Sequence, residues 1–121
     1  MGTVKKFEDL GIWQLARKLL NHIYDDFNKC KDYNLKNQII SAGLSITNNI
    51  AEGFGRESDK EFKQFLTIAK GSCEEVKSMY YTAEDLKYII TDIAEERRNR
   101  IFVLQIKISN FIFYLKKINT A

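Results

Sequence analysis

The sequence contains no proline, and this absence limits the possible folds more than any other feature. At an average usage of about 5%, a chain of this length would hold roughly six prolines. Proline usually occupies turns, sheet edges and the first turn of helices, and it interrupts helix interiors. We therefore expect few connections and long, uninterrupted helices.

The composition indicates a folded cytoplasmic protein. With 121 residues, of which 45% are hydrophobic and 29% charged, the chain fits one globular domain over residues 1–121 and is too apolar for a disordered protein. Cys30 and Cys73 have no metal-ligand spacing, so we expect two reduced thiols. We find neither a signal peptide nor a run of about 20 apolar residues, so we expect no membrane association.

Apolar residues recur at intervals of three and four along most of the chain, which is the spacing of amphipathic helices. The pattern predicts four helices, at about residues 8–30, 34–52, 59–90 and 92–119. Short connections force sequential helices to run antiparallel. The predicted fold is therefore all-α, an up-and-down antiparallel four-helix bundle.

The joint after the second helix is the best-marked boundary. Gly53 and Gly55 suit a left-handed turn that ends the helix. Ser58, followed three residues later by a glutamate, predicts a capping box at the start of the third helix, and Asp92 has the same arrangement before the fourth.

Polar residues gather at the same joint. We expect Glu52 and Arg56 to pair and hold the turn, and Asn49 to hydrogen-bond to backbone groups. The alternative is a polar ligand or catalytic site, for which only Glu52 offers a titratable base.

Some apolar residues lie on the side of a helix opposite its core line, where a monomeric bundle needs none. Such faces usually mark interaction surfaces, so we expect a homo-oligomer. The alternative is that these residues cover one another within one chain. A small-residue strip on the third helix would let another backbone approach closely. The candidate interface residues are Ile40, Leu44, Gly71, Phe102, Ile106 and Phe113.

The sequence offers little catalytic chemistry. His22 is the only histidine and has no Glu-x-x-His partner, so the di-iron motif of many four-helix bundles is absent. Phosphate-loop, dinucleotide and nucleophile-elbow motifs are absent as well. Cys73 lies on the core line, where an inert thiol is expected. We expect no enzymatic activity, no cofactor and no metal.

Basic residues leave nucleic acid open as a partner, although the net charge is only +3. Lys63, Lys70 and Lys77 repeat every seven residues along the third helix, with tyrosines on the same side. A solvated face explains this pattern equally well. Glu95 and Glu96 stand at ion-pair spacing from two of the arginines. The candidates on the fourth helix are Arg97, Arg98, Arg100, Lys107 and Lys117.

Three segments in order carry a family resemblance: FEDLGIWQLARKL, SITNNIAEGFGR and EFKQFLTIAKGSCEE. Together they resemble the four-helix-bundle family of 23S rRNA intervening-sequence proteins, over about residues 7–90. The resemblance implies a cytoplasmic bacterial bundle that assembles into a homopentameric ring. It also implies RNA or DNA as a partner, and it implies no enzymatic activity.

Two positions depart from the family pattern. Ile40 and Ser41 stand where the family tends to have paired arginines, and Thr47 stands where a proline is usual. The lost arginines weaken nucleic-acid binding at that surface, whereas Ile40 adds to the outer apolar stripe. The sequence thus predicts a homo-oligomeric bundle with nucleic acid as a partner, or alternatively an assembly scaffold or protein adaptor without nucleic acid.

Overall fold

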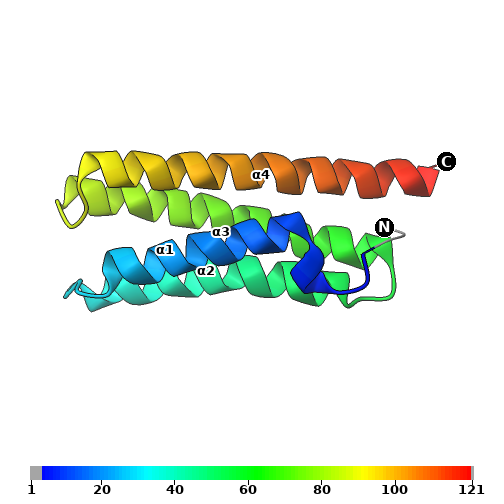
Figure 1. Cartoon of the computed structure of the whole chain (residues 1–121), viewed down its shortest axis with the longest axis horizontal. Coiled ribbons are helices and arrows are strands. Elements are labelled where there is room, and N and C mark those ends of the chain that lie inside the picture. The colour runs from blue at the N-terminus through cyan, green and yellow to red at the C-terminus, as the bar shows by residue number, and fades with distance from the viewer. Residues whose placement is uncertain (1–3, 121) are drawn as a thin grey trace.

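The computed structural model describes residues 4–120, and residues 119 and 120 by their backbone only. This range forms a short 3-10 helix, η1 (Phe7–Asp9), and four α-helices, α1 (Gly11–Phe27), α2 (Tyr33–Phe54), α3 (Asp59–Asp85) and α4 (Thr91–Thr120). Short turns join antiparallel neighbours, and α1 lies against α4 (Figure 1). The predicted all-α four-helix architecture is confirmed.

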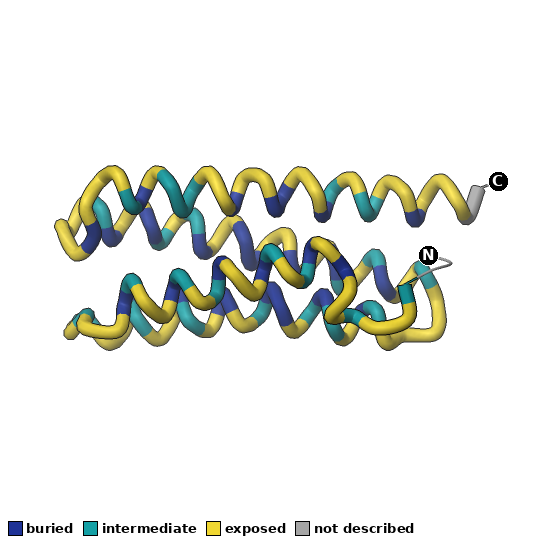
Figure 2. Tube along the Cα trace, in the orientation of Figure 1, coloured by how far each residue is buried: buried dark blue, intermediate teal, exposed yellow. Residues whose placement is uncertain are grey.

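The core runs along the centre of the bundle, where the inward faces of the four helices meet (Figure 2). The core line of α2, from Leu35 through Ile39 and Ile46 to Ile50, is buried throughout, and that of α3 is buried except at half-buried Phe65. The apolar spacing also places Tyr24 and Ile118 in the core, and this expectation is wrong. They are 45% and 41% exposed, because each lies at the edge of its apolar stripe near a helix end.

Two helix ends differ from their predicted positions. The first helix begins at Gly11 rather than at residue 8, because η1 and Leu10 precede it. The third ends at Asp85 rather than at residue 90. There Lys87 adopts a left-handed conformation with φ of 63°, and the N–H of Tyr88 donates to the carbonyl of Ala83 at 2.9 Å. This is a Schellman ending built on lysine instead of glycine, so no glycine marks it in the sequence.

Gly53 and Gly55, at the end of α2, do not form the predicted turn. Described glycines have no positive φ, so the expected left-handed turn is wrong. Gly53 instead lies inside α2, where a Cβ would stand 2.7 Å from the Cβ of Phe65 and 2.9 Å from Cδ1 of Phe62. The glycine therefore permits close approach of α2 and α3. Ser58 caps α3 as predicted, since its Oγ accepts from the N–H of Glu61 at 3.2 Å.

Helix capping also differs at two other helix starts. The fourth helix begins at Thr91, so Asp92 lies in its first turn rather than at the cap position. Asp32, which the pattern did not single out, caps α2 by accepting from the N–H of Leu35 at 3.2 Å.

A buried ion pair joins α1 to α4. Arg97 donates from Nε to Oδ2 of Asp26 at 2.7 Å and from Nη2 to Oδ1 at 3.0 Å. The two side chains are only 14% and 7% exposed. The hydroxyl of Tyr80, a fully buried α3 residue, donates to the same carboxylate at 2.7 Å. Three helices therefore meet at one carboxylate.

The pKa values around this network follow from its geometry. The hydrogen bond to Asp26 raises the pKa of Arg97, and burial followed by the bond to Asp26 raises the pKa of Tyr80. Burial, with Arg97 and Arg100 nearby, lowers the pKa of His22. Arg97 is thus a fixed cation and Tyr80 a fixed hydroxyl donor at neutral pH.

We predict that Gly53→Leu lowers the free energy of unfolding by about 2–3 kcal/mol, since overpacking at a rigid contact has a cost of this order. Urea denaturation measures the change. Gly11→Leu is the matched control, because a Cβ on Gly11 meets no atom within 4 Å, and it should shift the value by less than about 1 kcal/mol. Equal effects of the two substitutions would show that α2 and α3 are not in close contact at Gly53.

We predict that Asp26→Ala lowers the free energy of unfolding by about 3–5 kcal/mol, because it leaves a buried guanidinium without its carboxylate. Replacing the whole group with apolar residues, by Asp26→Leu, Tyr80→Phe and Arg97→Met together, should recover most of the loss. Thermal or urea unfolding checks both variants. A loss below about 1 kcal/mol for Asp26→Ala would contradict a buried network.

Candidate functional site

The arginines of α4 are largely engaged by carboxylates of the same chain. Arg97 is held by Asp26, as described above. Arg100 donates from Nε to Glu96, as the sequence predicted. Arg98, at helical ion-pair spacing from Glu95, instead donates from Nη1 to Glu84 of α3 at 2.8 Å. These pairs weaken the outward positive field of α4.

Arg98 makes a second contact, because its Cζ lies 4.0 Å from the centroid of the Tyr81 ring. A hollow of about 370 Å³ opens beside this pair between α3 and α4. Lys77 and Asn99 line it, as does Phe102, which is 54% exposed. Glu95 also lines it and would oppose a phosphate there.

The candidate lysines lie at the surface or at its edge. Lys70, Lys107 and Lys117 are exposed, and Lys63 and Lys77 are half-buried. Within residues 4–118, Lys63, Lys70 and Lys77 form no ion pair. The seven-residue repeat therefore places three available ammonium groups along α3.

The turn cluster has the structural role that we expected. Arg56 donates to Oε1 of Glu52 at 2.7 Å, and both side chains are about half exposed. The N–H of Gly55 donates to the carbonyl of Ala51 at 3.2 Å. Asn49 donates to the carbonyl of Ser45 at 2.7 Å and to its hydroxyl at 3.0 Å. These contacts fasten the end of α2 and pair Glu52, the one titratable base of the predicted cluster.

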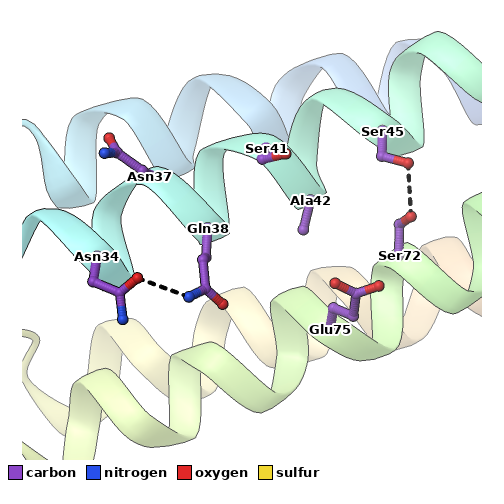
Figure 3. A pocket seen from close by; sticks show the side chains of 8 residues that line it. All are labelled: Asn34, Asn37, Gln38, Ser41, Ala42, Ser45, Ser72 and Glu75. Carbon is purple, nitrogen blue, oxygen red and sulfur yellow. Dashed lines mark hydrogen bonds between the residues drawn. The ribbon is translucent and has the colours of Figure 1, made fainter.

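The hydroxyl of Ser45 continues this chain of hydrogen bonds into a polar groove. Ser72 donates to it from α3 at 2.9 Å (Figure 3). Amide and hydroxyl side chains line the groove, which holds about 460 Å³ and includes a single carboxylate, Glu75. Gln38 donates to Asn34 at 2.9 Å within it. The groove can hydrogen-bond a polar ligand, and Glu75 is the titratable group that lines it. The one histidine of the chain lies on α1.

The outward side of α4 carries the largest exposed apolar side chains among the candidates. We call Phe102, Ile106 and Phe113 the α4 outer face; they are 54%, 44% and 68% exposed. Leu44 on α2 is 36% exposed, whereas Ile40 is half-buried against the core. The alternative that these residues cover one another within the chain is wrong for the α4 outer face.

Three further possibilities concern a reactive thiol, a metal site and a membrane-spanning helix. Burial raises the pKa of Cys73 to about 12, which keeps this buried thiol protonated and inert at neutral pH. Among the described residues, no three His, Cys, Asp or Glu side chains gather as a metal site. None of the described helices is both long and apolar enough to span a bilayer.

The structure also brings together residues that the sequence analysis did not connect. Asp26 and Tyr80 complete the hydrogen-bond network of Arg97. The position of Tyr80 on the core line could have indicated such a network, because a buried tyrosine hydroxyl needs a hydrogen-bond partner. Lys18 and Leu15 of α1 form a groove with Lys107 of α4, and the sequence carried no signal for it.

Comparison with known proteins supplies the family. The model of the 23S rRNA-intervening sequence protein family matches residues 8–110, which extends beyond the expected resemblance into α4. A search of curated proteins gave no match.

A solved structure shares the fold. It is that of a Bacteroides thetaiotaomicron VPI-5482 protein of unknown function from the S23 ribosomal protein family. The two chains superpose with a TM-score of 0.78 at 22% identity, over 84% of this chain and 97% of the other. Because the family model matches most of the chain, this protein belongs to the 23S rRNA-intervening sequence protein family.

Proposed function

We propose that the protein is a non-enzymatic bundle that assembles with copies of itself through the α4 outer face. The observation that carries this proposal is the exposure of Phe102 and Phe113, at 54% and 68%. Large aromatic side chains on one side of a helix are costly in water and are enriched at the centres of interfaces.

The spacing of the α4 outer face supports helix packing across copies. Phe102, Ile106, Ser109 and Phe113 follow one another at steps of four, three and four, which is the pattern of a coiled-coil seam. The small-residue strip on α3 is the surface that such a helix could approach closely, since Gly71 is exposed and a Cβ there would meet no atom within 4 Å.

Contact between α4 of one copy and α3 of the next would join two different surfaces. Interfaces of this head-to-tail type generate rings when the rotation closes. The family resemblance favours a ring of five copies. A partner protein on the same face, which would make the chain an adaptor, is the rival outcome.

RNA is a second candidate, and one observation favours it. Lys63, Lys70 and Lys77 lead toward the hollow beside Tyr81. There Phe102 and the Tyr81–Arg98 pair offer flat surfaces. Lysines contact phosphates and aromatic rings stack on bases, which is the combination found in single-strand binding. Self-association and RNA binding would compete for Phe102.

We predict that Phe102→Ser with Phe113→Ser dissociates the assembly and keeps the helical content. Central aromatic residues typically contribute about 2 kcal/mol or more each, so the pair should weaken association about a thousandfold. Light scattering measures mass, and circular dichroism measures helicity.

Tyr24→Ser with Tyr33→Ser is the matched control, because both tyrosines are exposed, at 45% and 63%, and lie on α1 and α2. The control should keep the wild-type mass. If the α4 variant also keeps that mass, the proposed interface is wrong.

We predict that single-stranded ribosomal RNA fragments bind at low salt with a log–log salt slope of about −2, as three phosphate contacts require. Replacing Lys63, Lys70 and Lys77 with Gln should remove this slope. Replacing exposed Lys5, Lys29 and Lys31 changes the net charge equally and should leave the slope in place. Absence of binding at low salt, or equal effects of the two triple variants, would exclude the lysine stripe as an RNA site.

A further inference from the structure

The seam between α1 and α4 is closed at one end and open at the other. The Asp26–Arg97 pair closes it near the end of α1. Toward the beginning of α1, a groove of about 740 Å³ lies between the two helices. Volumes of roughly 300–1,000 Å³ are typical of small-molecule sites.

Two features of α1 keep this groove open. Gly11 contributes no side chain to it, and a Cβ there would meet no atom within 4 Å. The side chain of Gln14 is tied back to η1, because its Nε2 donates to the carbonyl of Glu8 at 2.9 Å. Apolar and aromatic side chains line the groove together with the amides Gln14 and Asn110. Of the apolar ones, Ile12 is buried, Leu15 and Phe111 are half-buried, and Tyr114 is 41% exposed.

The charges at the groove have one sign. Lys18 on the α1 wall and Lys107 on the α4 wall both line it, and no aspartate or glutamate does. Neither lysine forms an ion pair within residues 4–118. Two ammonium groups beside an apolar surface repel each other and attract an anion.

The length of the groove limits the kind of anion that it can hold. Its lining spans residues 11–18 of α1 and 107–114 of α4, about two turns or roughly 11 Å of each helix. A groove of this length and volume suits a small molecule with an apolar chain.

We propose that the α1–α4 groove binds a medium- or long-chain carboxylate, a site independent of self-association. The carboxylate lies between Lys18 and Lys107, and the hydrocarbon chain covers Leu15, Phe111 and Tyr114.

Isothermal titration with decanoate below its micelle concentration tests this site on the full chain. Decanoate should bind at one site per chain, and decyltrimethylammonium, which has the same chain length and the opposite charge, should bind at least tenfold more weakly. Equal binding of the two would show an apolar surface without the proposed anion site and would overturn the proposal.

Two variants locate the site. Lys18→Gln with Lys107→Gln should weaken decanoate binding roughly tenfold, as loss of two partly exposed ion pairs implies. Gly11→Leu fills the groove from a position with free space and should abolish binding while the protein stays folded. Lys5→Gln with Lys31→Gln is the charge-matched control and should bind as wild type does. Wild-type affinity in the groove variants, or an equal loss in the control, would place the ligand elsewhere and refute the site.

Discussion

The buried ion pair between Asp26 and Arg97 joins the first helix of the bundle to the last. Turns connect α1 to α2, α2 to α3 and α3 to α4, whereas α1 and α4 are held together by side chains alone. The carboxylate of Asp26 accepts two hydrogen bonds from Arg97 and one from Tyr80, so it fixes three helices at one point. Removing one member of such a group is costly, because it leaves a buried charge without its partner.

This closure also determines what the surface can offer. Fixing α1 against α4 at one end leaves the apolar groove open at the other. The internal pairs of Arg97, Arg98 and Arg100 remove much of the cationic character of α4, so exposed apolar side chains dominate its outward side. The lysines of α3 are the remaining cations with the regular spacing that a polyanion needs. We therefore favour self-association over RNA binding, because the α4 outer face is apolar and the lysines of α3 form only a modest basic surface.

Much of the fold followed from periodicity alone. The core lines of α2 and α3 were predictable because a buried helix face repeats every three or four residues. The end of α3 was not, since a left-handed Lys87 carries no sequence signal and the apolar residues beyond it continue the helical pattern. Gly53 was noticed for the wrong reason, because a glycine needed for helix contact and a glycine needed for a turn look alike in one sequence.

The candidate site was predictable in part. Exposure of Phe102 and Phe113 followed from their angle on the helix, which needs no knowledge of the other helices. The partners of Arg97 and Arg98 lie 71 and 14 residues away, and such pairing depends on how the helices are aligned. The α1–α4 groove depends on the same alignment, so it was invisible from the sequence.

The central claim is that the α4 outer face is covered by another copy of this chain. Sedimentation equilibrium of the wild-type protein across micromolar concentrations tests it most directly. We expect a mass that is a whole multiple of 14.1 kDa. The family resemblance favours five copies, or about 70 kDa. A single species of 14.1 kDa throughout that range would contradict it.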